Sequence, residues 1–197
     1  MPQINLHNFL LRSRANGPGE RAVVWVQGCL RRCPGCFNPD SQTFATRELV
    51  SVQDLETRIL AEKGLEGVTF SGGEPFCQAA QLAELAKIIH GHGLTVVCYT
   101  GYTLEQIRQA HRQDWDALLS EVDLLIDGPF IEFERCAEPY RGSANQRLIF
   151  LSGRISPEAV AEAHQTAELT LSLDGSLTAT GFPEMMENIS EFLLTRR

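Results

Sequence analysis

The stretch GCLRRCPGC, residues 28–36, holds three cysteines in the spacing Cys29-x-x-x-Cys33-x-x-Cys36. It follows AVVWVQG, residues 22–28, a near-continuous apolar run with β-branched residues that indicates a buried strand. Iron–sulfur clusters are held by cysteine thiolates, commonly four of them. Three thiolates in one short loop can hold three corners of a four-iron cluster. The fourth iron is then open to a ligand from outside the protein.

Two other uses of this loop are open on the residues alone. One is a zinc site made of the three cysteines and a histidine, although no histidine lies near the loop in sequence or forms a His-x₃₋₅-His pair. The other is a redox pair of Cys33 and Cys36, which leaves Cys29 without a role. The remaining cysteines stand far apart and are expected to be buried free thiols: Cys77, Cys98 and Cys136.

The composition is that of a globular protein, with 197 residues of which 43% are hydrophobic and 21% charged. No apolar run reaches the about 18 residues that a transmembrane helix needs. The N-terminus lacks the basic and apolar regions of a secretory signal. The net charge of −8 disfavours binding to nucleic acid. We therefore expect a cytoplasmic protein with neither nucleic acid nor membrane as its partner.

Strand-like and helix-like segments alternate along most of the chain. Short runs with apolar residues predict strands over residues 5–13, 22–28, 67–70, 94–100, 122–128 and 146–153. Capping residues and apolar positions at helical spacing predict helices over residues 51–64, 77–93, 103–120 and 156–165. A hairpin over residues 168–182, with Asp174-Gly175 at its turn, and a helix over residues 183–197 complete the chain.

This alternation predicts an α/β fold with a parallel sheet and covering helices. A complete eight-stranded barrel usually needs about 250 residues. The chain is shorter, so we expect a partial, open parallel β/α barrel of about six strands, forming a single domain over residues 1–197 with a C-terminal hairpin and helix. In such sheets the chemistry lies at the carboxyl ends of the strands.

Several motifs fall at those strand ends. In SGGEP, residues 71–75, Gly72 and Gly73 let the backbone approach a ligand closely, and Glu74 adds a carboxylate to the same rim. YTGYT, residues 99–103, and IDGPF, residues 126–130, follow the next two strands. Turns and helix caps use the same residue types, so each motif taken alone also has an ordinary structural explanation.

The cysteine spacing resembles the signature of the radical S-adenosylmethionine (SAM) superfamily. CPGCFN, SGGEP, DGPF and RGSANQR (residues 141–147), in this order over roughly residues 16–150, are similar to the activating proteins of anaerobic ribonucleotide reductase, which carry a single 4Fe-4S cluster. The resemblance implies a [4Fe-4S] cluster on Cys29, Cys33 and Cys36 whose open iron binds the amino and carboxylate groups of SAM. Reductive cleavage of SAM would then yield a 5′-deoxyadenosyl radical, chemistry that side chains alone do not supply.

The resemblance also implies the residues that bind SAM. Glu74, with its neighbours Ser71, Gly72 and Gly73, holds the methionine ammonium. The adenine lies near Gly35 and Phe37, although Gly35 stands where many superfamily members have an aromatic residue. The other residues expected at the cofactor are Asn38, Thr100, Asp127 and Arg141.

The function implied is the activation of a glycyl-radical enzyme, such as anaerobic ribonucleotide reductase, with electrons from a flavodoxin- or ferredoxin-type donor. One alternative keeps the SAM chemistry and changes the substrate to a peptide or small molecule selected by residues 151–197. A remote alternative is a non-catalytic iron–sulfur electron carrier, which needs neither SGGEP nor an open iron.

Overall fold

The computed structural model describes residues 2–161, 163, 167–171, 175 and 177–181. They form a seven-stranded sheet in the order β3-β1-β2-β4-β5-β6-β7. Its strands are β1 (Gln3–Ser13), β2 (Arg21–Val26), β3 (Glu48–Ser51), β4 (Gly67–Gly72), β5 (Thr95–Tyr99), β6 (Leu124–Asp127) and β7 (Arg147–Phe150). A separate hairpin pairs β8 (Ala167–Leu171) with β9 (Leu177–Gly181).

The centre of the sheet is parallel and its flanks are antiparallel. Strands β2, β4, β5 and β6 run parallel to one another. Strand β1 pairs antiparallel with both β2 and β3, and β7 pairs antiparallel with β6. The α/β class, the mostly parallel centre and the C-terminal hairpin are confirmed. Within the described residues the sheet has seven strands, where about six were expected, and its two edges are β3 and β7. The predicted helix over 183–197 lies outside the described residues.

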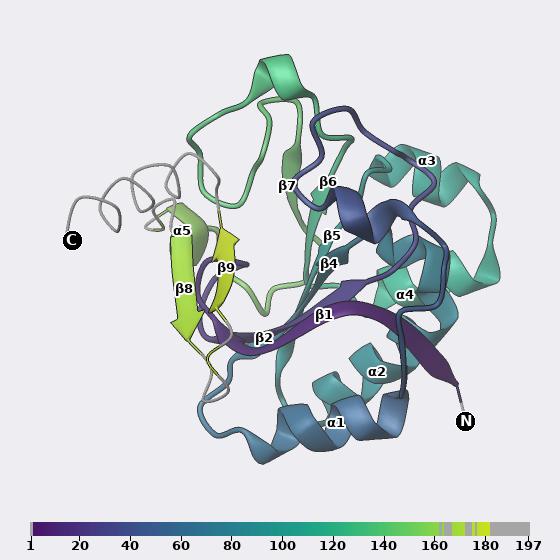
Figure 1. The fold of residues 1–197 in the computed structure, drawn as a ribbon, viewed down its shortest axis with the longest axis vertical. Helices are drawn as coiled ribbons and strands as arrows, with labels where there is room; N and C mark the ends of the chain where they lie inside the picture. Colours follow the sequence, from purple (N-terminus) through teal and green to yellow (C-terminus); the bar gives the residue numbers. More distant parts are fainter. Residues whose placement is uncertain (1, 162, 164–166, 172–174, 176, 182–197) are drawn as a thin grey trace.

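Four helices cover one face of the sheet (Figure 1). They are α1 (Val52–Ala61), α2 (Ala79–Gly91), α3 (Leu104–Gln109) and α4 (Gln113–Ser120). The short α5 (Pro157–Ala161) and the β8–β9 hairpin lie on the other side. Single 3₁₀ turns lie at η1 (Pro39–Gln42), η2 (Pro75–Gln78) and η3 (Glu132–Glu134). Helix α1 begins at the predicted cap, where Ser51 Oγ accepts a hydrogen bond from the backbone N–H of Asp54. The apolar faces of α1 and α2 pack on the sheet and form the main core.

The single helix predicted over residues 103–120 is wrong, because the chain forms two helices there. His111 adopts a left-handed backbone conformation with φ of +49°, which ends α3 before α4 begins. The break lets Trp115 of α4 pack edge-on against Phe76, with ring centroids 5.4 Å apart. Helix α3 starts as predicted, with Thr103 and Gln106 forming a capping box.

Arg21 is the first residue of β2 and lies buried at the amino-terminal end of the parallel strands. Its side chain is 1% exposed and donates hydrogen bonds to Thr69 Oγ1, to the carbonyls of Pro18 and Val68, and to both oxygens of Thr95. Burial lowers the pKa of Arg21 to about 10, and nearby carboxylates oppose this shift. The guanidinium thus joins β2, β4 and β5 at the end opposite the cysteine loop.

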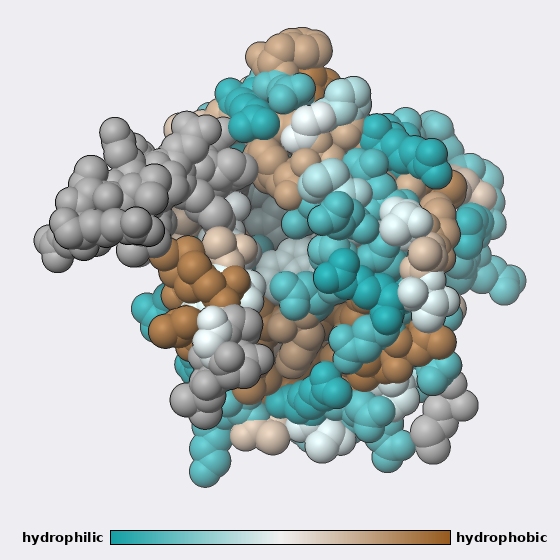
Figure 2. Space-filling model, in the orientation of Figure 1, coloured by the Kyte–Doolittle hydropathy of each residue, from teal (hydrophilic) through white to brown (hydrophobic). Residues whose placement is uncertain are grey.

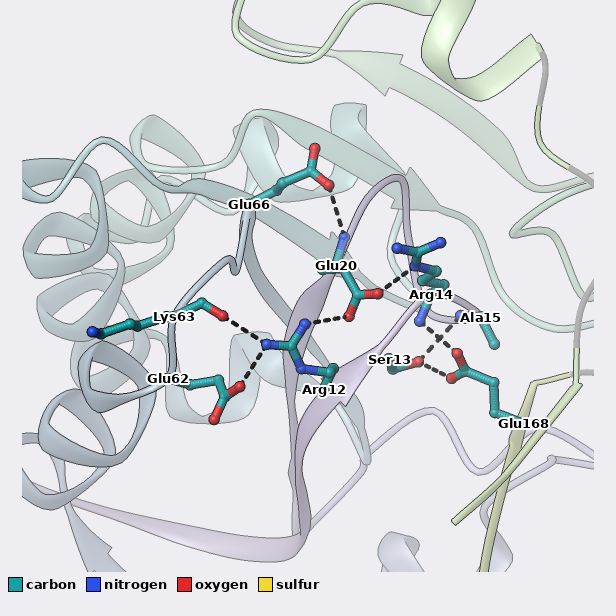
Figure 3. A network of polar contacts seen from close by, with 9 residues as sticks. All are labelled: Arg12, Ser13, Arg14, Ala15, Glu20, Glu62, Lys63, Glu66 and Glu168. Atoms are coloured by element: carbon teal, nitrogen blue, oxygen red, sulfur yellow. Dashed lines mark hydrogen bonds and ion pairs between the residues drawn. The ribbon is translucent and has the colours of Figure 1, made fainter.

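A polar network ties the end of β1 to its neighbours (Figure 3). Arg12 bridges Glu20 and Glu62, at 3.1 and 2.5 Å. On the other side of the same strand end, Ser13 Oγ donates to Glu168 Oε2 over 2.5 Å. The network therefore links α1 and the loop after β1 on one side with the β8–β9 hairpin on the other. No helix in the described part of the chain is both long and apolar enough to cross a membrane.

Candidate active site

The cysteine loop leaves the carboxyl end of β2 and is held on both sides by backbone hydrogen bonds. The N–H of Gly28 donates to the carbonyl of Ser41 over 2.7 Å, and the N–H of Glu74 donates to the carbonyl of Gly28 over 2.9 Å. Gly28 has a φ of +101°, a conformation that side chains strongly disfavour. The first cysteine is therefore placed directly beside the SGGEP segment.

Cys29, Cys33 and Cys36 are free thiols that line one cavity of about 350 Å³, a size within the usual range for small-molecule sites. Burial raises the pKa of Cys29, and backbone N–H groups of Arg32 and Arg31 act in the opposite direction. The N–H of Asn38 contacts Cys36 Sγ at 3.4 Å. The cavity opens on a face that is hollowed near its centre (Figure 2).

A zinc ion would need these thiolates and a fourth ligand around one position. In the described part of the chain, no three His, Cys, Asp or Glu side chains converge to hold a metal ion. A four-iron cluster makes a different demand, because each thiolate binds its own iron. The donor set of three free cysteines on one loop fits such a cluster.

The SGGEP segment brings backbone into direct contact with the cysteine loop. A Cβ atom on Gly73 would lie 2.3 Å from the carbonyl oxygen of Gly28, and one on Gly72 would lie 2.6 Å from the backbone nitrogen of Val26. Both distances are shorter than atoms tolerate, so only glycine allows this approach. Ser71, Gly72, Gly73 and Glu74 all line the cavity.

The carboxylate of Glu74 is fully buried at the cavity wall. Its Oε1 accepts hydrogen bonds from the N–H of Phe76 at 3.0 Å and from Thr100 Oγ1 at 2.9 Å, and its Oε2 accepts from the N–H of Gly101 at 2.8 Å. Burial raises the pKa of Glu74 to about 7, while these donors and the charge of Arg31 act to lower it. The carboxylate is thus held in one orientation beside the three thiols.

Other predicted residues meet at the same cavity. Thr100, Phe37 and Asn38 line it, and Phe37 packs against Phe130 with ring centroids 4.7 Å apart. Gly35 has a φ of +67°, and a Cβ there would lie 2.5 Å from the carboxylate carbon of Glu132. Gly35 therefore shapes the loop and does not itself line the cavity.

Two predicted residues have other partners. Asp127 accepts from the N–H of Leu104 at 2.7 Å and from Arg147 Nε at 2.9 Å, so it caps α3 and pairs with β7. Arg141 donates to the carbonyls of Ala144 and Gln146 and holds its own loop. Neither side chain lines the cavity, and a direct role for them in binding SAM stays a prediction.

Arg31 is a cavity residue that the sequence reasoning treated only as part of a basic pair. Its guanidinium lies 5.1 Å from the centroid of the Tyr102 ring, and its Nε is buried without a hydrogen-bond partner. It lines the same cavity as the cysteines and Glu74. The only sequence signal that Arg31 would line the cavity was its position, as a cation, in the middle of the cysteine motif.

A second group that the sequence reasoning missed supports the loop from behind. Gln27 is 3% exposed, and its Nε2 donates to the carbonyls of Asp40 and Thr43 at 3.0 and 2.8 Å. Gln78 Nε2 in turn donates to the carbonyl of Gln27 at 3.0 Å. The available sequence signal was the position of Gln27 at the end of a buried apolar run, because a buried amide needs hydrogen-bond partners.

The comparisons with known proteins agree with this geometry. Residues 15–149 match the family model described as the 4Fe-4S single cluster domain. The chain belongs to this family. Strand β1, helix α5 and the hairpin β8–β9 of this 4Fe-4S single cluster protein lie outside the family match.

Relatives of this 4Fe-4S single cluster protein are named for the activation of other enzymes. It is 30% identical over 156 residues to the anaerobic ribonucleoside-triphosphate reductase-activating protein of Vibrio cholerae serotype O1, covering 73% of this chain and 96% of that protein. The protein of that name from Enterobacteria phage T4 is 31% identical over 140 residues, covering 68% and 85%. The pyruvate formate-lyase-activating enzyme of Staphylococcus epidermidis is 33% identical over 129 residues, covering 62% and 51%. The resemblance to anaerobic ribonucleotide reductase activating proteins is confirmed.

Proposed function

We propose that this protein is a radical SAM enzyme that activates a glycyl-radical enzyme. The proposed target is an anaerobic ribonucleoside-triphosphate reductase, the enzyme for which several relatives are named. When bound, a [4Fe-4S] cluster and SAM supply a 5′-deoxyadenosyl radical that takes a hydrogen atom from a glycine of the target. The observation that carries the proposal is that three free cysteines and the fixed carboxylate of Glu74 open onto one cavity.

The residues of the chain have distinct tasks in this proposal. Cys29, Cys33 and Cys36 ligate three irons and leave one position for SAM. Glu74 accepts the methionine ammonium, because a charge-assisted hydrogen bond to a carboxylate is a strong contact. Thr100 holds Glu74 in place through the 2.9 Å hydrogen bond.

Arg31 and the aromatic pair complete the proposed cofactor site. Arg31 lies beside Glu74 and opposes the protonation of its carboxylate. Phe37, packed against Phe130, offers an apolar surface for the adenine near Gly35. Asn38 lines the same part of the cavity and offers an amide to the nucleoside.

The proposed setting is a reducing cytoplasm, because the three ligands must be thiolates to hold iron. A flavodoxin- or ferredoxin-type protein is the proposed electron donor. Both are inferred from the chemistry that the cluster requires.

The decisive experiment is anaerobic reconstitution of the cluster followed by reduction with dithionite in the presence of SAM. We expect 5′-deoxyadenosine and methionine in equal amounts. With its target enzyme present, we expect a glycine-centred radical seen as a doublet by electron paramagnetic resonance, and oxygen should then cleave the target chain at that glycine. Cluster formation without SAM cleavage would instead support an electron carrier.

A second candidate keeps the SAM chemistry and takes a free peptide or small molecule as substrate. It is favoured by one observation, that residues Thr178, Ala179, Thr180 and Gly181 of β9 line the same cavity and narrow it. Turnover on such a molecule, with no glycyl-radical enzyme present, would select this candidate over the first.

A further inference from the structure

Strand β9 presents an unpaired edge to the cavity. Among the described residues β9 pairs with β8 alone, and four of its five residues line the cavity that holds the three cysteines. Figure 1 shows β9 on the side of β8 that faces the central sheet. A free strand edge offers a row of backbone donors and acceptors for another extended chain.

The hairpin is held in this position by side chains from both parts of the molecule. Glu168 of β8 accepts from Ser13 Oγ at 2.5 Å and from the N–H of Arg14 at 2.8 Å (Figure 3). Asn16 Nδ2 donates to Thr180 Oγ1 of β9 at 2.9 Å. Ser13 and Thr180 are both buried. These contacts fix the edge of β9 relative to β1 and to the cavity wall.

The chemistry of the cavity changes from one end to the other. The charged side chains of Arg31 and Glu74 line the cavity together with the cysteines, whereas Asn16 and Thr180 supply neutral polar groups at the hairpin. A phosphate or carboxylate ligand would call for cations there. Neutral amides and hydroxyls instead match the N–H and C=O groups of a polypeptide.

We propose that β9 binds an extended polypeptide segment as an added strand, alongside the cavity and next to the cysteine loop. The proposal rests on the proposed function, in which this segment carries the target glycine of the partner enzyme. Strand addition uses backbone hydrogen bonds for affinity and leaves side chains alternating between two faces. A residue without a side chain can then come closest to the reacting atoms.

The test on the ligand side uses a synthetic peptide of about ten residues centred on the target glycine of the partner anaerobic ribonucleoside-triphosphate reductase. Its affinity for the reconstituted protein with SAM is measured by anaerobic calorimetry while single backbone nitrogens are methylated in turn. We expect binding to weaken about tenfold at every second position and to change little at those between, since alternate N–H groups face β9. An even response along the peptide would overturn the proposal.

The test on the protein side uses Glu168→Ala, which removes both contacts of the hairpin to the end of β1. Affinity for the peptide should fall about tenfold, while iron content per chain, which checks folding, stays at the level of the unaltered protein. Glu158→Ala, on the exposed side of α5, is the matched control and should keep full affinity. Equal affinity in both variants would contradict the role of the hairpin.

A third variant separates backbone from side-chain recognition. Thr178→Val keeps the shape and the backbone of β9 and removes its hydroxyl, and peptide affinity should change less than twofold, about 0.4 kcal/mol or less. If the partner enzyme is activated but the peptide shows no alternating pattern, the strand-addition proposal fails and the activase proposal stands. If neither the partner nor the peptide responds while SAM is cleaved, the proposed function fails, and the inference falls with it.

Discussion

Thr100 Oγ1 donates a 2.9 Å hydrogen bond to Oε1 of Glu74, which joins the end of β5 to the segment after β4. The N–H of Gly101 reaches the other carboxylate oxygen from the same turn. Because the carboxylate is fully buried, these donors supply the interactions that water would otherwise provide. The charge of the cavity wall therefore depends on the turn that follows the neighbouring strand.

The affinity for SAM should depend on pH through Glu74. Burial raises the pKa of its carboxyl to about 7, so the charged acceptor is lost as pH falls through that value, and affinity should fall with it. The unliganded protein should show the opposite trend. A folded-state pKa above the ordinary value of 4.5 means that stability from this group declines as pH rises from that value to about 7.

Thr100→Val should displace this pH dependence in a known direction. It removes a donor that lowers the pKa of Glu74, so the midpoint of SAM binding should move to higher pH. Calorimetric titrations at several values between about pH 6 and pH 8 measure the shift. An unchanged midpoint would show that the hydroxyl does not tune the carboxylate.

Glu74→Gln should weaken SAM binding while the cluster is retained. A charge-assisted hydrogen bond contributes about 1.5–3 kcal/mol, so the dissociation constant should rise roughly 10- to 100-fold. The amide –NH₂ would also face the N–H of Gly101 or the donors of Oε1, and some loss of stability is expected. Unaltered affinity for SAM, measured at equal iron content, would show that the SGGEP segment serves only as a turn and does not bind SAM.

The six cysteines should divide into two sets. Substituting alanine for Cys29, Cys33 or Cys36 should abolish the cluster, because each supplies one iron ligand. The same change at Cys77, Cys98 or Cys136 should leave iron content intact, and the core position Cys98 should lose some stability through lost packing. Iron and sulfide analysis of each folded variant measures this, and cluster loss in the second set would contradict the assignment.

Asp127→Asn separates the two roles open to this residue. Asp127 is fully buried and holds the start of α3 and Arg147, so we expect a lower free energy of unfolding, by about 1–3 kcal/mol. Affinity for SAM should stay within a factor of about two. Strong loss of SAM binding in a folded variant would instead support the cofactor role predicted from the sequence.

Arg21→Met should destabilise the fold far more than the same change at Arg12. Arg21 is buried and donates to acceptors on two strands and a loop, which would be left unsatisfied. We expect the free energy of unfolding to fall by about 2–4 kcal/mol in chemical denaturation. Arg12 lies in a solvent-exposed network, and its loss should have a smaller effect.

Much of the fold was readable from local signals. Ser51 and Thr103 begin helices as predicted, since a cap depends on residues within one turn. The break at His111 was not readable, because neither glycine nor proline marks it. The antiparallel direction of β7 was also hidden, since a short apolar run looks the same in either orientation.

The site residues also divide into those that local sequence motifs predict and those that depend on long-range contacts. The cysteine loop and the SGGEP segment are contiguous motifs, and both reach the cavity. Asp127 was predicted from its position at a strand end and Arg141 from the family resemblance, but their partners come from residues that are close only in space or in the folded loop. The contact of Arg31 with Tyr102 and the arrival of β9 at the cavity depend on long-range packing that one sequence does not reveal.

The close approach of Gly73 to the carbonyl of Gly28 has a consequence for how this site would change over generations. Where the rim of the cavity is main chain, the groups that face a ligand are backbone N–H and C=O groups, which are the same whatever residue the gene encodes. Substitution there can block the site but cannot retune it. Variation in ligand preference is therefore confined to the wall built from side chains, where Glu74 and Arg31 lie.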